Sequence, residues 1–346
     1  MAVEPLRDLR AGRTLPARDY WDPDVHAVER AGIFGREWLC LGPADAVAAA
    51  GSYLAECVAG WPVLVVRDAV GELRGFHNVC RHRAGPLVDD GSGTGRAFVC
   101  RYHGWSYELD GSLRSARDAG LDPEELDGLG LLELRVAVWR GLLFVNLDLD
   151  APEIEEWLGE GFVAQCAAFP MEAWTPVVRQ THPIASNWKT YSDNYLEGYH
   201  IPFVHPGLAR AIDTSSHEVH VEDGWIRHSA TTREGASTAG VWLYHWPNLA
   251  LNLYERGMSV ERWLPTSPTS CELVLDYCFA DTSDAAAVEN RRDLDSSTET
   301  CLEDKAICEA VQRNLEAGAY VDGLLSPRHE AGVADFQARV RRARAV

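Results

Sequence analysis

Two short pairs of cysteine and histidine constrain this chain more than any other feature. One residue separates Cys80 from His82, two residues separate Cys100 from His103, and seventeen residues lie between the pairs. Each pair is expected in a β-hairpin loop, and two thiolates with two imidazoles can hold a structural zinc ion. They can equally hold a two-iron, two-sulfide cluster in which histidines replace two cysteines on one iron. The spacing alone leaves both possibilities open.

The sequence around these pairs consists of short β-rich segments with turn residues between them, from about Trp38 to Leu149. Asp110-Gly111 stands between two alternating stretches, which is a strong hairpin signal. We therefore expect a small antiparallel β domain over residues 39–149. Before it, Asp22-Pro23 predicts the capped start of a helix. Residues 1–38 are expected to be a helical segment that packs on the second domain.

The second domain, over residues 150–346, shows a different pattern. We predict a helix over about 186–200 and a long helix over about 284–317, with strands over about 218–232, 240–256 and 258–280. Strands followed by segregated helices indicate an α+β fold with helices on one side of an antiparallel sheet. The expected arrangement is helix-grip-like, with the long helix packed on the sheet.

The stretch from Asn187 to Pro206 offers a second candidate metal site, with Glu197, His200 and His205 inside nine residues. Its aromatic side chains recur at helical spacing at positions 188, 191, 195 and 199, and residues three apart on a helix share one face. Pro202 is expected to end this helix, which would let His205 fold back beside His200. Two imidazoles suit iron, zinc or copper. Two ordinary histidines near a helix end remain the alternative.

Composition excludes some functions. The formal net charge of −20 argues against nucleic-acid binding, which needs basic patches. No apolar run approaches the roughly 20 residues of a membrane helix, and the N-terminus lacks the apolar core of a signal peptide, so a cytoplasmic protein is expected. The nine cysteines are then expected as reduced thiols. We interpret those outside the two pairs as small buried hydrophobic residues: Cys40, Cys57, Cys166, Cys271, Cys278, Cys301 and Cys308.

The two pairs and their surroundings, CRHRAGPL and CRYHGWSYELDG, closely resemble the Rieske motif. The resemblance implies a [2Fe-2S] cluster in which Cys80 and Cys100 bind one iron and His82 and His103 bind the other. Clusters with histidine ligands have higher potentials than those with cysteine alone, which suits a one-electron relay that feeds oxygen chemistry.

With such a cluster upstream, the stretch EGYHIPFVH at 197–205 resembles the mononuclear iron motif of Rieske non-haem iron oxygenases, in their catalytic α subunits. The resemblance covers nearly the whole chain. It implies that His200 and His205 bind Fe(II) with one distant aspartate, a triad that leaves positions open for dioxygen. It also implies a homotrimer in which Glu197 links the cluster of one subunit to the iron of the next. Electrons would come from NAD(P)H through a separate reductase, with or without a ferredoxin.

Asp304 is the best candidate for the third ligand. It lies on an apolar helical stripe with Cys301, Cys308, Val311 and Leu315. A carboxylate on such a stripe must be paired, neutral or metal-bound, because an unpaired buried charge is costly. Its neighbour Glu303 points about 100° away on a helix and is expected to be solvated. The segment also resembles the family pattern at the ligand aspartate. Glu330 and Asp335, in the C-terminal tail, are weaker alternatives.

The substrate is suggested by the acid at the bridging position. Glu197 stands where ring-hydroxylating dioxygenases usually carry aspartate, and its context looks more like the oxygenases of quaternary ammonium compounds such as choline, betaines and carnitine. The resemblance implies hydroxylation or oxidative N-demethylation of such a compound. An aromatic, heterocyclic or secondary-metabolite substrate for the same machinery is the alternative. Residues expected to line the pocket, where aromatic faces could attract an ammonium group, are Asn194, Tyr195, Ile201, Trp246 and Asn252.

Overall fold

The computed structural model describes residues 12–233 and 240–344. The described chain divides into two compact units, Gly35–Trp157 and the segments before and after it. Both units are built on antiparallel sheets, and the helices are concentrated in the second, so the predicted α+β class is confirmed. None of the described helices is long and apolar enough to cross a membrane.

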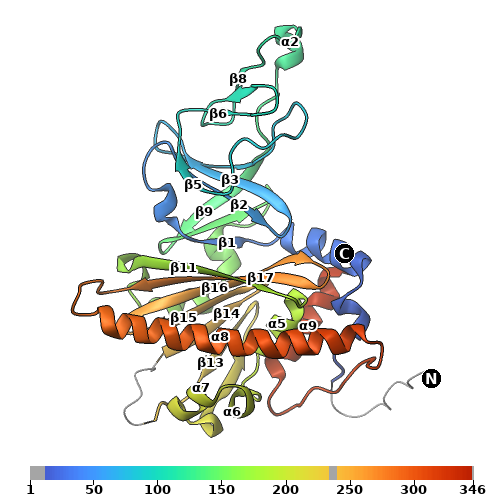
Figure 1. The fold of residues 1–346 in the computed structure, drawn as a ribbon, viewed down its shortest axis with the longest axis vertical. Helices are drawn as coiled ribbons and strands as arrows, with labels where there is room; N and C mark the ends of the chain where they lie inside the picture. The colour runs from blue at the N-terminus through green and yellow to red at the C-terminus, as the bar shows by residue number, and fades with distance from the viewer. Residues whose placement is uncertain (1–11, 234–239, 345–346) are drawn as a thin grey trace. The chain divides into compact units, whose positions relative to one another are not determined.

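The Gly35–Trp157 unit is a β domain with two sheets (Figure 1). The larger sheet has the order β1-β10-β9-β4-β3-β2-β5 and the smaller has the order β6-β7-β8. Gly111, with φ of 87°, lies in the turn between β7 and β8, a conformation that glycine adopts at little cost. The strands are β1 Leu39–Pro43, β2 Ser52–Val58, β3 Trp61–Arg67, β4 Leu73–His77, β5 Gly91–Thr94, β6 Phe98–Val99, β7 Ser106–Tyr107, β8 Leu113–Ser115, β9 Glu133–Trp139 and β10 Leu142–Asn146. Short helices are η3 Ala44–Val47 and α2 Pro123–Leu126, and α3 Ile154–Leu158 lies at the C-terminal end of the unit.

The core of this unit reaches into the two candidate metal loops. Cys80 and Cys100 belong to the same buried cluster as Phe76, Trp105 and Tyr107. Packing of the loops on this core fixes the cysteines before any metal is considered. Among the other seven cysteines, Cys57 is exposed, so its interpretation as a buried residue is wrong; the remaining six are buried. Cys57 lies on β2, where its neighbour Val58 is buried, because successive side chains of a strand face opposite ways.

The second unit contains a seven-stranded antiparallel sheet of order β11-β17-β16-β15-β14-β13-β12. Each of the three predicted strand regions is a hairpin of two strands, and the β11 strand was not predicted. The bounds are β11 Thr175–Ile184, β12 Glu218–Val221, β13 Trp225–Ser229, β14 Gly240–His245, β15 Leu249–Tyr254, β16 Gly257–Ser267 and β17 Ser270–Phe279.

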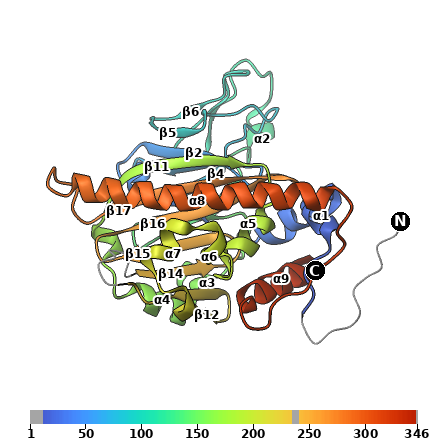
Figure 2. The same ribbon diagram turned by 60° about the horizontal axis from the view of Figure 1, so that its bottom comes forward.

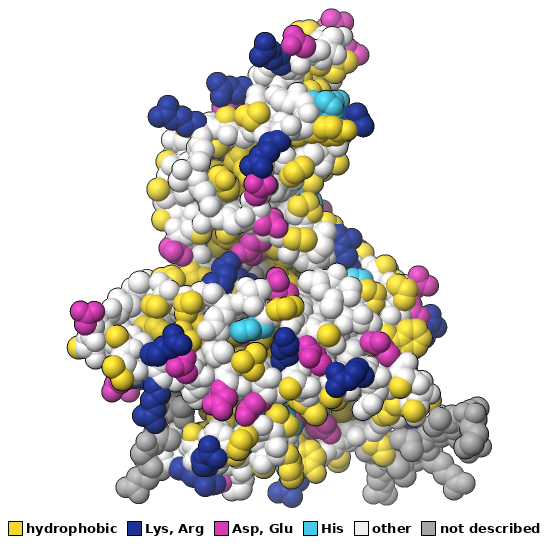
Figure 3. All heavy atoms as spheres, viewed as in Figure 1, with side chains coloured by type: hydrophobic (Ala, Val, Ile, Leu, Met, Phe, Trp, Pro, Cys, Tyr) yellow, Lys and Arg dark blue, Asp and Glu magenta, His cyan; other side chains and the backbone are white. Residues whose placement is uncertain are grey.

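Helices cover one face of this sheet, and the longest, α8 Ala287–Glu316, extends over it beside β11 (Figure 2). Acidic and basic side chains are interspersed on the surface around α8 (Figure 3), as expected for a solvated helix face. The other helical elements are η1 Ala17–Tyr20, α1 Pro23–Glu29, η2 Arg30–Phe34, α4 Glu160–Cys166, η4 Met171–Ala173, α5 Trp188–Tyr195, α6 Ile201–Val204, α7 Pro206–Ala211, η5 Thr214–Ser216 and α9 Ala331–Arg344.

The N-terminal helical segment packs on α5. Lys189 and Glu29 form an ion pair of 2.6 Å with both side chains buried, and the ring of Phe34 packs edge-on against Trp188. Tyr20 donates a hydrogen bond to Asp193. The first eleven residues of the predicted segment 1–38 lie outside the described part of the chain.

The predicted helix over 186–200 ends earlier than expected. Regular α5 stops at Tyr195, and the carboxylate of Glu197 accepts hydrogen bonds from the backbone N–H groups of Tyr199 and His200. These bonds replace the helical ones, because a side-chain acceptor can satisfy N–H groups that no longer have a helical partner. Pro202 lies in the first turn of α6 and does not end α5. Tyr199 therefore leaves the aromatic stripe and is 54% exposed.

Candidate functional site

The loops that carry Cys80 and Cys100 have matching backbone turns. The N–H of Cys80 bonds to the carbonyl of Gly85, and the N–H of Cys100 bonds to that of Trp105, each five residues on. The residues four after each cysteine, Ala84 and Gly104, have positive φ of 54° and 73°. The two cysteines thus occupy equivalent positions in two similar turns, as expected for a paired ligand set.

The side chains of this ligand set differ in exposure. Cys80 and Cys100 are each 2% exposed, whereas His82 and His103 are exposed. The imidazoles lie side by side with ring centroids 4.6 Å apart, and His82 stacks on Trp105 at 4.8 Å. A cluster held here would have its cysteine side buried and its histidine side at the surface. That arrangement suits electron exchange with another protein.

The arrangement fits a two-iron cluster better than a zinc ion. Four ligands of one tetrahedral zinc lie about 2.0–2.3 Å from the metal, and therefore within about 4.6 Å of one another. Within the described residues, the one group of three or more metal-binding side chains that meets a 4.8 Å limit is His200, His205 and Asp304. The two Cys/His loops do not form such a group. The [2Fe-2S] group is larger and has two metal atoms to bind.

His200, His205 and Asp304 converge as the sequence predicted. The Nε2 atoms of the two histidines are 3.1 Å apart. Oδ1 of Asp304 lies 2.8 Å from Nε2 of His205 and 3.6 Å from Nε2 of His200. Asp304 comes from α8, and the histidines come from either end of α6. Two imidazoles and one carboxylate are the donor set of non-haem iron sites with open positions, so these residues fit a mononuclear iron.

Each donor of this triad has a polar partner behind it. Nδ1 of His200 lies 2.5 Å from Oε1 of Glu197, and Nδ1 of His205 lies 2.7 Å from Oε2 of Glu303. The amide of Asn194 donates to Oδ1 of Asp304 at 2.6 Å. Such partners orient metal-binding histidines and raise their basicity. The expectation that Glu303 is solvated is wrong, because the ring of His205 reaches both adjacent acids on α8.

The structure also shows which residues of the α8 stripe are buried and which partners the two alternative acids have. The buried residues of the stripe are Cys301, Asp304, Cys308, Gln312 and Leu315, and Val311 is 40% exposed. At that turn the buried position is Gln312, one residue after the predicted Val311. Asp335 pairs with Arg339 at 2.7 Å and Glu330 accepts from the backbone of Ser326. Both alternative acids have partners away from the triad.

The triad opens into a cavity of about 530 Å³. Opposite the helices, one row of cross-strand neighbours lines this cavity. Trp242 pairs with His228 and with Asn252, and Ser259 pairs with Asn252 and with Tyr277. All five residues line the cavity, because paired residues on adjacent strands point to the same face. The sheet thus forms the floor of the pocket.

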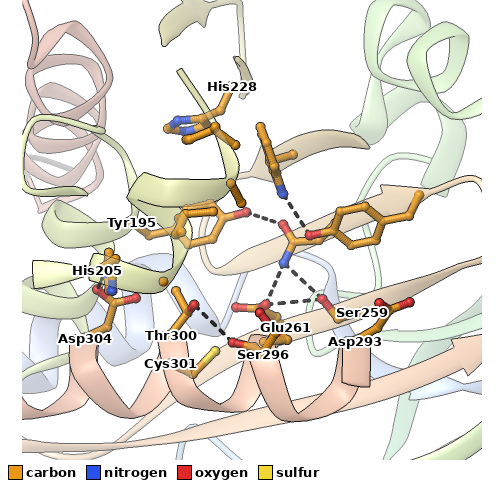
Figure 4. A pocket seen from close by; sticks show the side chains of 18 of the residues that line it. Tyr195, His205, His228, Ser259, Glu261, Asp293, Ser296, Thr300, Cys301 and Asp304 are labelled. Carbon is orange, nitrogen blue, oxygen red and sulfur yellow. Dashed lines mark hydrogen bonds and ion pairs between the residues drawn. The ribbon is translucent and has the colours of Figure 1, made fainter. Parts of the chain in front are cut away.

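A polar network crosses this floor, as Figure 4 shows. The hydroxyl of Tyr195 donates to Oδ1 of Asn252 at 2.8 Å. The amide nitrogen of Asn252 donates to Ser259 at 3.0 Å and to Glu261 at 2.5 Å. Glu261 is 3% exposed. Its burial raises the pKa of the carboxyl to about 7, with a further contribution from the nearby Asp304 charge.

The pKa of His228 shifts in the opposite direction from that of Glu261. Burial, together with the smaller effects of the nearby His217, His200 and His220, lowers its pKa to about 3. The imidazole is therefore neutral, and its ring is T-shaped to Tyr195 with centroids 5.7 Å apart. Its presence in the cavity places no positive charge there.

Four of the five predicted pocket residues line the cavity, namely Asn194, Tyr195, Ile201 and Asn252. Trp246 does not. It lies beyond the end of β14, where its ring packs against Trp188 and Phe336. Sequence reasoning did not identify His228, Ser259 and Glu261. Glu261 could have been noticed, since it is an acid inside the predicted strand 258–280, but which residues face it depends on strand register.

Family comparisons agree with this geometry. The family described as "Rieske [2Fe-2S] domain" matches residues 37–123, and the family described as "Ring hydroxylating alpha subunit (catalytic domain)" matches residues 171–242 and 228–345. The choline monooxygenase of Atriplex hortensis is 33% identical over 96% of this chain and 78% of its own length. The carnitine monooxygenase oxygenase subunit of Escherichia coli K12 is 30% identical over 93% of this chain and 91% of its own.

A solved structure extends the likeness to the whole fold. The crystal structure of the quaternary ammonium Rieske monooxygenase CntA matches with a TM-score of 0.86 and 25% identity, covering 96% of each chain. Oxygenase α subunits of this kind need electron-transfer partners and form multimers. The plant relative is named as chloroplastic, so the cytoplasmic location stays a prediction.

The matches span both domains and nearly the full length of the chain. They account for the paired Cys/His loops and for the two-histidine, one-carboxylate triad together. The chain therefore belongs to the Rieske non-haem iron oxygenases, enzymes whose cofactors are a Rieske [2Fe-2S] cluster and a mononuclear iron.

Proposed function

We propose that this enzyme inserts one oxygen atom into a C–H bond of a small quaternary ammonium compound. The observation that carries the proposal is that the triad opens into a cavity whose walls combine aromatic rings with carboxylates. Tyr195, Trp242, Tyr254 and Tyr277 line it together with Glu261. Aromatic faces and carboxylates attract an alkylammonium group. The names of the choline and carnitine relatives support the same substrate class.

The site geometry and the family resemblance together support the residue roles that we propose. Cys80 and Cys100 bind one iron of the cluster, and His82 and His103 bind the other. His200, His205 and Asp304 bind the mononuclear iron, which when bound supplies the activation of dioxygen. Glu303 and Asn194 hold the ligands in place. The cavity walls position the substrate carbon near the triad and exclude water, which is the protein's own contribution to the rate.

The overall reaction needs two electrons and two protons for each dioxygen, with one oxygen atom entering the substrate and the other leaving as water. A separate reductase that oxidises NAD(P)H supplies the electrons, directly or through a ferredoxin. In a homotrimer, the His103 side of one subunit would face Glu197 and His200 of its neighbour. Inter-subunit electron transfer is described for CntA. If the oxidised carbon is an N-methyl group, the resulting carbinolamine releases formaldehyde.

A substrate panel tests this proposal. The holoenzyme with a surrogate reductase is given choline, glycine betaine, carnitine and aromatic compounds, and oxygen uptake, formaldehyde and hydroxylated products are measured. Oxygen uptake coupled to oxidation of an ammonium compound supports the proposal. Oxidation of the aromatic compounds alone would overturn it in favour of an aromatic or heterocyclic substrate. The Asp304→Ala variant is the control, because uptake that persists in it does not come from the mononuclear site.

A further inference from the structure

The cavity contains a buried acid that neither metal site uses. Glu261 is on β16, with Oε1 accepting from the amide of Asn252 at 2.5 Å and from the hydroxyl of Ser259 at 3.3 Å. Among the described residues, Oε2 has no hydrogen bond and no arginine, lysine or histidine forms an ion pair with this carboxylate. The side chain is 3% exposed and lines the cavity. A buried carboxylate normally has a charged partner, because an unpaired one is costly.

The structure shows that Glu261 is held facing the cavity. Strand register places Ser259 and Glu261 on the same face of β16, two residues apart, and Ser259 pairs with Asn252 across β15. The hydroxyl of Tyr195 fixes the Asn252 amide in turn. Figure 4 shows the carboxylate of Glu261 joined to Ser259 by a dashed line. The acid is thus positioned by two neutral partners, Asn252 and Ser259, and is available to a ligand.

The basic side chains of the cavity do not balance this acid. Among the described residues that line it, the arginines are Arg256 and Arg292, and lysine is absent. Arg256 is already paired with Glu289 and Asp293, and Arg292 is exposed. His228 is held neutral. The interior therefore offers a carboxylate for a cation and no buried cation for a substrate carboxylate.

We propose that Glu261 is the counter-ion of the substrate's ammonium group, so that the cavity selects a cationic ammonium compound over a zwitterion with the same head group. This inference rests on the proposed function and narrows its substrate class to ammonium compounds without a carboxylate, such as amino alcohols. Burial that raises the pKa of the free acid to about 7 is consistent with a site completed by a cation. A bound ammonium ion favours the ionised form.

The test measures binding to the anaerobic holoenzyme by calorimetry with three probes. Choline carries only the cation, glycine betaine carries the cation with a carboxylate, and 3,3-dimethylbutan-1-ol is the uncharged carbon analogue of choline. Wild-type protein is expected to bind choline about tenfold or more tightly than either other probe. Glu261→Gln is expected to weaken choline binding by about tenfold or more and to leave binding of the neutral analogue unchanged.

The matched control is Glu255→Gln, which removes the same charge from an exposed position at the same cavity and is expected to change choline binding little. If Glu261→Gln weakens the binding of choline and of the neutral analogue equally, Glu261 has a structural role and the inference is overturned. Unchanged choline binding in this variant would overturn it as well. Tighter binding of glycine betaine by wild-type protein would also overturn it, without any variant. If an ammonium compound is oxidised in these cases, the proposed function stands; if none binds or reacts, the proposed function itself fails.

Discussion

Three side chains approach a single oxygen atom of Asp304. Asn194 donates to Oδ1, and the Nε2 atoms of both histidines face it at 2.8 and 3.6 Å. The hydrogen bonds at Nδ1 of each histidine leave Nε2 free to face a metal, because a neutral imidazole carries its proton on only one nitrogen. The three ligand atoms are therefore positioned by the protein itself. Metal binding needs little rearrangement.

We predict that Asp304→Ala removes the mononuclear iron and turnover while the Rieske cluster remains. Iron content is expected to fall from about three to about two atoms per chain, measured together with sulfide and the electron paramagnetic resonance of the reduced cluster. Asp335→Ala, which breaks a pair on α9, is the control and is expected to keep full iron. Retention of the third iron by Asp304→Ala would refute its assignment as a ligand.

Glu303 gives a second prediction at this scale. Glu303→Ala is expected to lower iron affinity about 10- to 100-fold, because Nδ1 of His205 loses its 2.7 Å acceptor. Iron retained after dialysis against graded chelator measures the change. Glu299→Ala removes an exposed acid one turn earlier on α8 and serves as the comparison. Equal iron retention in both variants would show that Glu303 does not support the site.

Glu197 is expected to act on electron transfer more than on metal content. Glu197→Gln keeps the size of the side chain and removes its charge, so both metal centres are expected to remain. Reoxidation of the reduced cluster in the presence of substrate and dioxygen is expected to slow, which rapid-mixing absorbance spectroscopy measures. A rate equal to that of the wild-type protein would rule out Glu197 as the link between the centres.

At the scale of elements, α5 is held by a buried ion pair. Lys189 and Glu29 are 0% and 1% exposed, and the Trp188 indole N–H also donates to Glu29. Burial of both charges is tolerable because each has partners. Removal of Lys189 leaves the buried Glu29 carboxylate with Arg344, at 3.7 Å, as its remaining cationic partner among the described residues. The pair joins α1 to the helix that precedes the metal-binding histidines.

We predict that Lys189→Met destabilises the protein by about 3–5 kcal/mol, measured as the free energy of unfolding in denaturant. The double variant Lys189→Met with Glu29→Gln is expected to recover much of that loss, because it also removes the buried Glu29 charge, whose closest cation is gone in the single variant. A double variant no more stable than the single one would indicate that lost packing, rather than the buried Glu29 charge, causes the effect.

The elements also show how far sequence reasoning reaches. Helical spacing located α8 to within three residues at its start and one at its end, and with family resemblance identified Asp304, because a buried stripe is a local property. The end of α5 was missed because Glu197 caps the next N–H groups, which competes with helix geometry. Glu261 and His228 could not be assigned to the pocket, since cross-strand register is a long-range property.

At the scale of the whole molecule, the proposed homotrimer would make catalysis depend on assembly. We predict that subunits inactivated in different domains complement each other. Cys100→Ser removes the cluster and Asp304→Ala removes the mononuclear iron, so each homotrimer alone is expected to be inactive. Trimers formed from both are expected to regain part of the wild-type rate, because the cluster of one subunit then lies beside the iron of the next. Activity is measured after co-expression with two affinity tags.

The control for complementation is a mixture of the separately purified variants without subunit exchange, which is expected to stay inactive. If electrons passed only within one chain, co-assembled trimers would be as inactive as their parents. Sedimentation would report the oligomer present in every sample, so that loss of assembly is distinguished from loss of transfer.

The floor of the cavity has one further consequence, for how such an enzyme changes over time. Each of the five strands β13 to β17 contributes one side chain to the row from His228 to Tyr277, whereas the proposed iron ligands come from the α6 region and α8. Single substitutions in the row can reshape the chamber while the iron ligands stay intact. Substrate preference can therefore evolve by single substitutions in an enzyme that retains its oxygen chemistry at every step.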